Sequence, residues 1–314
     1  MIITVTPNPA LDKIYWVDKL SHDPEAPLTR ATRSMTSPGG KGINVSIFLT
    51  RLGIENVAMG FIAGHTGRVI ENKVREEGVT TNFVWTDGET RTNAIIIEKG
   101  KEASPLEVNE AGAVVSKIAL EHFMSRYKRI LKRAKYVVFG GSLPPGVDSS
   151  FYKELITLAK RHQVKTIVNT GGAALTEAIE AAPLLVKPDI RERKEIRGVA
   201  VDSLEKLVKV GKEMLSSGVE MVLVSHEITH DVLITKQGVW DLEAQNVNFQ
   251  NMVGAEDALI GGLVYKLYQG VSGEEAAKFG MAAATASAEI AEEVSIDKAA
   301  VERALNRIKM VRLE

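Results

Sequence analysis

The chain has 314 residues, of which 45% are hydrophobic and 25% charged, and its formal net charge is −1. This balance argues against nucleic acid or an anionic membrane as the main partner, and the absence of cysteine excludes disulfides and thiolate metal sites. Because no run of about 18 apolar residues and no signal-peptide pattern is present, we expect a soluble, cytoplasmic protein without a membrane segment.

Short apolar runs bounded by proline, glycine or asparagine predict strands, and longer amphipathic runs predict helices. In the first half the predicted strands are 2–6, 14–17, 28–36, 57–62, 83–85, 93–98 and 136–139. The predicted helices there are one that follows the glycine-rich turn 39–42 and ends at 53, then 68–77, 112–131 and 149–162.

The second half alternates strands and helices more regularly. The predicted strands are 166–169, 184–187, 221–225, 231–235 and 239–244, and the predicted helices are 173–181, 204–216, 256–269, 274–292 and 298–308. This alternation predicts an α/β fold whose mainly parallel sheet is covered on both faces. The runs 231–235 and 239–244, with Gly238 between them, predict an antiparallel hairpin at the sheet edge.

The chain shows neither an internal repeat nor a linker, so we expect a single domain over residues 1–314. Strands within about 12–36 and 85–107 fall outside the strand–helix alternation. We expect them to form a small separate sheet over one end of the main sheet.

The segment 226–230 reads His-Glu-Ile-Thr-His and matches the HExxH pattern of zinc proteases. That pattern binds zinc only when both histidines lie on one face of a helix. Because the flanking runs are typical of strands, we expect a loop here and no zinc site.

The segment Gly254-Ala255-Glu256-Asp257 joins a polar loop to an apolar helix. Small residues let backbone N–H groups approach an anion at a helix N-terminus, and Asp257 could accept a proton from an attacking hydroxyl. The alternative is an ordinary helix whose first turn carries acids, which the helix dipole favours.

Several polar residues of the N-terminal half are suited to a phosphorylated polyol. Lys41 and Asn44 follow the glycine-rich turn, Arg91 lies in a turn between strands, and Asp12 could accept sugar hydroxyls. Each could instead be an ordinary turn or surface residue. Together with the C-terminal segment they describe phosphoryl transfer to a hydroxyl.

The sequence resembles the PfkB (ribokinase-like) carbohydrate kinases over nearly its whole length. The matching segments are 8–12 (NPALD), 39–45 (GGKGINV), 89–93 (ETRTN), 141–146 (GSLPPG), 187–188 (KP) and 254–257 (GAED). The first and third resemble more specifically the branch with 1-phosphofructokinase, 6-phosphofructokinase and tagatose-6-phosphate kinase.

The resemblance implies a three-layer αβα sandwich with a β-sheet lid, two lids often pairing in a homodimer. It implies Asp257 as catalytic base beside an anion hole formed by the backbone of 254–257. It places a sugar phosphate between Lys41, Arg91 and Ser142. The implied contacts to the sugar hydroxyls are Asp12, Gly39, Gly40 and Asn44.

The resemblance also implies that ATP binds over the C-terminal half and that Mg²⁺ bridges its phosphates. The implied nucleotide contacts are Asn169, Lys187, Ser225 and Gly254, and the implied metal-side residues are Asp189 and Glu192.

The chain departs from the family pattern mainly in the nucleotide half. Glu256 replaces a usual glycine, the segment 225–230 lacks the usual two glycines, Asn169 replaces an aspartate and Asp189 an asparagine. A Glu256 carboxylate about 5 Å from the transferring phosphoryl group would raise the barrier by on the order of 3 kcal/mol, roughly a hundredfold in rate. That penalty disappears if the carboxylate points into solvent or binds a second Mg²⁺.

Our leading hypothesis is therefore an ATP-dependent kinase of a phosphorylated ketohexose such as fructose 1-phosphate. One alternative is a non-catalytic or attenuated homologue that binds a sugar phosphate. Another is a kinase for unphosphorylated ribose or nucleosides.

Overall fold

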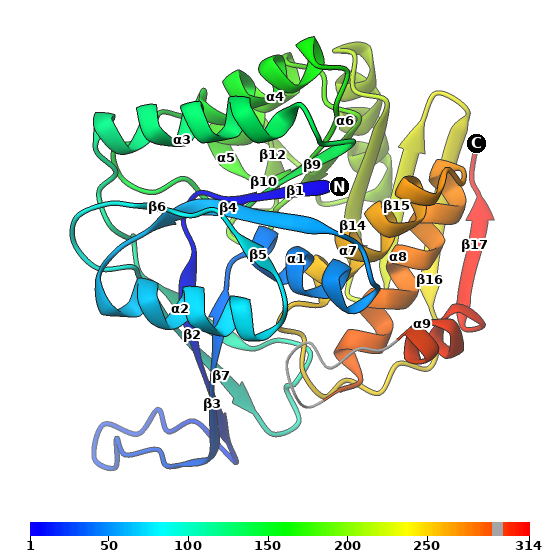
Figure 1. Cartoon of the computed structure of the whole chain (residues 1–314). Helices are drawn as coiled ribbons and strands as arrows, with labels where there is room; N and C mark the ends of the chain where they lie inside the picture. Colours follow the sequence, from blue (N-terminus) through cyan, green and yellow to red (C-terminus); the bar gives the residue numbers. More distant parts are fainter. Residues whose placement is uncertain (291–297) are drawn as a thin grey trace.

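The computed structural model describes residues 1–290 and 298–314, and within them one large sheet forms the centre of the molecule (Figure 1). Its order is β17-β16-β15-β14-β11-β10-β9-β1-β4-β5, with β6 paired to β4. Its strands are β1 (Ile2–Thr6), β4 (Asn56–Ile62), β5 (Thr80–Thr81), β6 (Val84–Trp85), β9 (Tyr136–Gly140), β10 (Lys165–Thr170), β11 (Leu185–Pro188), β14 (Met221–Glu227), β15 (His230–Thr235), β16 (Gly238–Ala244) and β17 (Ile308–Arg312).

Helices cover both faces of this sheet (Figure 1). They are α1 (Lys41–Arg51), α2 (Gly64–Glu76), α3 (Lys117–Leu131), α4 (Phe151–Arg161), α5 (Gly172–Glu180), α6 (Leu204–Ser216), α7 (Ala255–Gln269), α8 (Gly273–Ala288) and α9 (Lys298–Leu305). Because side chains alternate along a strand, Ile2 of β1 packs with α1, α7 and α8, whereas its neighbour Ile3 packs with α3 and α4. Within the large sheet, the neighbouring strands β14, β11, β10, β9, β1 and β4 all pair in parallel. This arrangement confirms the predicted α/β architecture.

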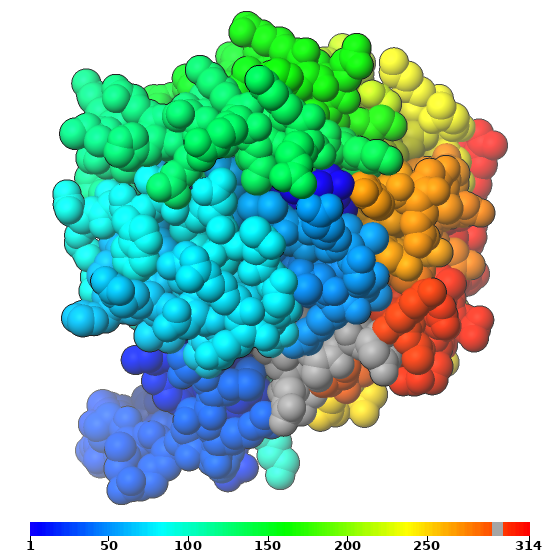
Figure 2. All heavy atoms as spheres, in the orientation of Figure 1, coloured from blue at the N-terminus to red at the C-terminus, as the bar shows by residue number. Residues whose placement is uncertain are grey.

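A second sheet of four strands lies beside the main body, in the order β3-β2-β7-β8. Its strands are β2 (Ala10–Val17), β3 (Ala31–Gly39), β7 (Thr92–Glu98) and β8 (Leu106–Asn109). We call it the small sheet; its apolar contacts centre on Ile14, Ile95 and Ile97. The blue segment between β2 and β3 projects from the body in the space-filling view (Figure 2). Trp85 belongs to β6 of the large sheet, so the early strands divide between the two sheets.

The C-terminal end differs from the sequence prediction. The hairpin of β15 and β16 does not form the edge, because β17 pairs antiparallel with β16 outside it. The predicted helix 298–308 ends at Leu305, and the alternation of half-buried and exposed residues after it is that of a strand. Residues 291 and 292 of the predicted helix 274–292 lie outside the described residues.

Two other segments also bear on the sequence predictions. The predicted helix 112–131 begins only after Ser116, whose Oγ accepts a hydrogen bond of 3.2 Å from the Ala119 amide as an N-cap. The HExxH residues lie on a hairpin in which β14 ends at Glu227 and β15 begins at His230, so the helix that zinc binding requires is not formed. A short ribbon of β12 (Glu195–Ile196) and β13 (Val199–Ala200) completes the described fold. No described helix is long and apolar enough to cross a membrane.

Candidate active site

Most predicted site residues gather where the parallel strands end. Asn8 follows β1, Ser142 follows β9, Asn169 lies near the end of β10 and Asp189 follows β11. In a parallel α/β sheet these ends share one edge, which is where ligands usually bind.

Helices α1 and α7 bring their N-termini to this edge side by side. A Cβ atom on Gly261 would lie 2.5 Å from Cδ1 of Phe48, so the missing side chain is what allows the two helices to approach. Asn44 lies one helical turn before Phe48, and Asp257 lies one turn before Gly261. The Asn44 amide accordingly donates a hydrogen bond of 2.8 Å to Oδ2 of Asp257.

Helix α7 starts at Gly254, whose φ of 77° lies in the left-handed region that favours glycine. Glu256 and Asp257 follow within the first helical turn. The positive φ therefore occurs at Gly254, whereas the backbone of Glu256 is ordinary α-helix. The Ala255 amide donates to the Met252 carbonyl at 3.2 Å. The amides that follow it in this first turn can bind an anion.

Asp257 is 6% exposed, and its Oδ1 is buried without a hydrogen-bond partner in the described part of the chain. Burial raises the pKa of this carboxyl to about 6, although the nearby Lys41 ammonium acts in the opposite direction. An ionised carboxylate with one oxygen held by Asn44 and the other free is suited to accept a proton.

Glu256 lies at the centre of a buried group of cations. Its Oε2 contacts Nζ of Lys41, and its Oε1 lies 3.1 Å from Nζ of Lys187. Burial alone would raise the pKa of Glu256, but the two ammonium groups outweigh it and lower the pKa to about 2. The Glu256 side chain is only 22% exposed. The sequence-based alternative of a solvent-facing Glu256 carboxylate is therefore wrong.

Arg191, which the sequence analysis did not identify, joins this cluster from the loop after β11. Its guanidinium lies 3.0 Å from Oδ2 of Asp189, 3.8 Å from Oε2 of Glu256 and 3.4 Å from Oε1 of Glu107. Since Glu107 belongs to β8, Arg191 connects the end of the large sheet to the small sheet. Asp189 also lies 3.2 Å from Nζ of Lys41. Glu192 is exposed and makes no contact with these side chains in the described residues.

Lys187 and Ser225 form the nucleotide side of the predicted site. Lys187 is 1% exposed and donates a hydrogen bond of 2.8 Å to Ser225 Oγ, which in turn donates one of 2.7 Å to Asp231. Both polar side-chain atoms of the buried Asn169 lack hydrogen-bond partners in the described chain, so they are available to a ligand.

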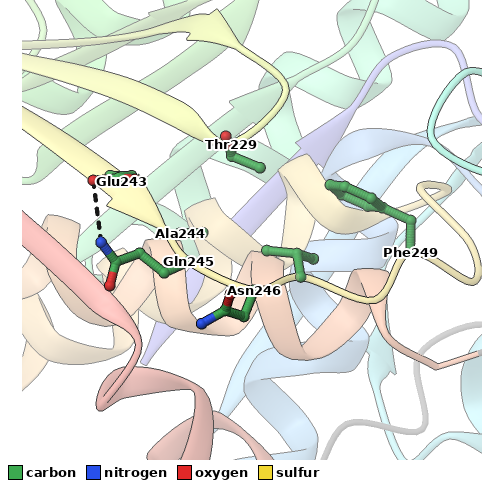
Figure 3. Close-up of a pocket in the computed structure, with 7 residues that line it drawn as sticks. Thr229, Glu243, Ala244, Gln245, Asn246 and Phe249 are labelled. Carbon is green, nitrogen blue, oxygen red and sulfur yellow. Dashed lines mark hydrogen bonds between the residues drawn. The ribbon is translucent and has the colours of Figure 1, made fainter.

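A cavity adjoins Lys187, Ser225 and Glu256 and continues along apolar residues of α8. Beside it lies an open pocket of about 460 Å³. Figure 3 shows the lining residues, among them Thr229 at the β14–β15 turn and Phe249 from the loop after β16. Sequence reasoning did not find the pocket, because its lining combines Thr229 with the separate segment 243–249.

Asp12 lies on the small sheet, where Asn93 donates a hydrogen bond of 2.7 Å to its Oδ1. Burial raises the pKa of Asp12 to about 6, against the opposing effects of Asn93 and Arg91. A Cβ atom on Gly39 would lie 2.0 Å from Oδ2 of Asp12, so a larger residue at that position would displace the Asp12 carboxylate. Gly40, with φ of 115°, then caps helix α1.

Arg91 and Ser142 meet at Asn8. The Arg91 guanidinium donates hydrogen bonds of 2.9 Å to the Asn8 carbonyl and 3.1 Å to that of Glu110, and its buried Nε has no partner among the described residues. The Asn8 amide lies 3.4 Å from Ser142 Oγ, to which it donates. The Lys41 ammonium instead lies with Glu256 and Asp189, so in the described residues Lys41 and Arg91 do not contact each other.

Comparison with known proteins agrees with this geometry. Residues 8–292 match the pfkB family of carbohydrate kinases. The chain is 32% identical over 313 residues to a 1-phosphofructokinase of Bacillus subtilis, with 100% of both chains covered. It is 31% identical over 290 residues to a D-tagatose-1-phosphate kinase of Bacillus licheniformis, with 92% of each covered.

Solved structures give the same result. The crystal structure of a possible 1-phosphofructokinase from Thermotoga maritima is 33% identical to the chain, covers 100% of both chains and superposes with a TM-score of 0.92. This similarity also confirms the predicted ribokinase-like fold. The chain therefore belongs to the pfkB family of carbohydrate kinases.

Proposed function

We propose that the protein transfers the γ-phosphoryl group of ATP to a hydroxyl of a phosphorylated ketohexose, with fructose 1-phosphate as the first candidate. The observation that carries this proposal is the buried Asp257 carboxylate, held through Oδ2 by Asn44 and free at Oδ1. Relatives named for fructose and tagatose phosphates support the class of substrate.

In the proposed reaction, Oδ1 of Asp257 accepts the proton of the acceptor hydroxyl as its oxygen attacks the γ-phosphorus. The bond from that phosphorus to the bridging oxygen breaks, and the electron pair leaves with ADP. A pKa of about 6 keeps Asp257 ionised near neutral pH and more basic than an ordinary aspartate. The amides at the start of α7 face the charge that develops on the phosphoryl group.

The nucleotide half of the proposed site consists of Lys187 and Ser225, with Asn169 beside them at the end of β10. The cavity next to Lys187 leads toward Thr229 and Phe249, which offers a partly apolar surface for the base of ATP.

Asp189 is the residue that would hold Mg²⁺, in exchange for its present contacts with Lys41 and Arg191. The described residues contain no group of three or more metal-ligating side chains, so substrate phosphates would supply the other ligands. Magnesium in kinases is commonly held by one or two carboxylates together with substrate phosphates, and the ionised Asp189 at this edge is such a carboxylate. Bound there, the ion would neutralise charge on the transferring phosphates. Glu192 is the other residue proposed from the resemblance, and its exposed position requires a separate test.

The sugar phosphate is proposed to bind where Arg91 and Ser142 approach each other, with Lys41 supplying charge from the α1 side. The free Nε of Arg91 leaves the guanidinium able to donate to a phosphate. Asp12, together with Gly39 and Gly40 of the adjoining backbone, would face the sugar hydroxyls.

An attenuated kinase is the second candidate, and one observation favours it. The segment that in the resembling family carries a glycine-rich phosphate loop is a tight hairpin turn between Glu227 and His230 here. This candidate predicts that the sugar phosphate binds while ATP binds weakly. Titration calorimetry with each ligand distinguishes it from the full kinase.

We also propose that two small sheets pair in a homodimer. Leu106 and Val108 of β8 are 49% and 58% exposed, which leaves apolar surface on that sheet. Sedimentation analysis should give twice the chain mass; Leu106→Glu should shift it toward monomer. A monomeric wild type would reject the dimer.

A coupled ADP-release assay over a panel of hexose phosphates tests the proposed reaction. We expect turnover with at least one ketohexose phosphate and a loss of about three orders of magnitude or more in Asp257→Ala. The proposal is wrong if the wild type does not exceed this variant on any substrate.

A further inference from the structure

The carboxylate of Glu256 touches cations that belong to different halves of the proposed site. Lys41 comes from α1 on the sugar side, and Lys187 comes from β11 on the nucleotide side. Each lysine takes a different oxygen of the same carboxylate. Glu256 is thus the direct link between the two half-sites.

Both lysines are poorly exposed, Lys41 at 9% and Lys187 at 1%. A buried ammonium needs an anionic partner, because losing it leaves an uncompensated charge away from water. Asp189 lies 3.2 Å from Lys41 and Asp231 lies 4.0 Å from Lys187, but Glu256 is the nearer carboxylate to each lysine. A phosphate group that binds either lysine therefore competes first with Glu256.

Arg191 offers the displaced carboxylate a new position. Its Nε lies 3.8 Å from Oε2 of Glu256, and its side chain is 59% exposed. Glu256 can thus turn from the buried lysines toward this guanidinium, which it would share with Asp189 and Glu107, without losing all cationic contact.

Resting on the proposed function, we infer that Glu256 is a positioning residue that couples the binding of the two substrates. In this mechanism one movement of Glu256 toward Arg191 removes the Glu256 contact from Lys41 and Lys187 together. Binding of the first phosphorylated ligand provides the free energy for that movement. The second ligand then binds its lysine without having to break the contact with Glu256. Each ligand therefore strengthens the binding of the other.

The direction of this effect is opposite to simple electrostatics. Two phosphorylated ligands repel each other, so without the Glu256 link their binding should be independent or mutually weakening. Positive coupling that depends on Glu256 is consequently a specific signature.

Titration calorimetry of fructose 1-phosphate, with and without saturating Mg·ADP, measures the coupling. For the wild type we expect affinity to increase on the order of tenfold when Mg·ADP is present. In Glu256→Gln each ligand alone should bind more tightly than to the wild type, and the factor should fall to about one.

Two further variants distinguish the simultaneous contact of Glu256 with both lysines from a general effect of removing or changing a carboxylate. Glu256→Asp keeps the charge but is too short to hold both lysines at once, so its coupling should also fall. Glu77→Gln removes a carboxylate from a surface pair with Arg51, at 2.7 Å, and should retain wild-type coupling. Thermal unfolding of each variant shows whether it is folded.

A wild-type factor of one or less, or full coupling in Glu256→Gln or Glu256→Asp, would overturn the inference. If the wild type phosphorylates fructose 1-phosphate without such coupling, the inference alone fails. If no hexose phosphate binds or turns over, the proposed function fails and the inference with it.

Discussion

Replacing Asp257 by asparagine should make the protein more stable at pH 8 while abolishing its proposed catalysis. The carboxyl is 6% exposed, and burial raises its pKa from 3.8 to about 6. Asparagine has nearly the same shape and retains an oxygen that can accept the hydrogen bond from Asn44, but it carries no charge to bury.

The magnitude follows from that difference in pKa. Because the folded protein holds this proton more tightly than the unfolded chain, the group's favourable contribution is complete below pH 3.8 and is lost as pH rises through 6. The difference between 3.8 and about 6 corresponds to about 3 kcal/mol of destabilisation at pH 8. Asp257→Asn should remove this penalty.

Urea unfolding of the wild type and Asp257→Asn between pH 5 and pH 8 measures the effect. The advantage of the variant should be about 3 kcal/mol at pH 8 and shrink to roughly half near pH 5. An Asp257→Asn protein that is less stable than wild type at pH 8, or a difference independent of pH, would refute the assignment of a buried carboxylate with a raised pKa.

Three further predictions concern activity. The pH profile of kcat/KM should fall below about pH 6, because Asp257 must be ionised to accept a proton; activity that stays constant down to pH 5 would contradict this. Steady-state kinetics of Arg91→Ala should show KM for the sugar phosphate raised by roughly one to two orders of magnitude, whereas an unchanged KM would favour an unphosphorylated substrate. Asp189→Ala should raise the Mg²⁺ concentration needed for half-maximal rate about tenfold or more, while the exposed Glu192→Gln should leave it near the wild-type value; equal effects would give Glu192 a metal-side role.

Local sequence patterns are sufficient for much of the fold. The alternation of short apolar strands with helices predicts the parallel sheet, because the spacing of apolar residues in each segment indicates which of its faces is buried. The strand β17 was missed because it directly follows a helix, and only pairing with β16 shows it to be an edge strand. The hairpin of β15 and β16 was consequently assigned to the edge.

The site was less predictable, because its electrostatics depend on residues far apart in the chain. The position of Asp257 in the first turn of a helix was visible in the sequence. The contact of Lys41 with Glu256 joins residues 215 positions apart and follows only from the packing of α1 beside α7. The estimated penalty for Glu256 counts only the charge of its carboxylate, whereas the structure places Lys41 and Lys187 against that carboxylate.

Arg191 likewise could not be predicted as a site residue from the sequence. Nothing in its local sequence distinguishes it from the neighbouring exposed charged residues. Its importance comes from the topology, which places the loop after β11 against β8 of the small sheet and allows contacts with both Glu107 and Asp189.

Phosphorus NMR of the product tests the central claim most directly. Incubation of the wild type with ATP, Mg²⁺ and fructose 1-phosphate should convert the sugar phosphate into a bisphosphate together with ADP. Asp257→Asn should bind both substrates, as calorimetry can verify, and yield no bisphosphate on the same timescale. Bisphosphate formation by Asp257→Asn at the wild-type rate would contradict the account.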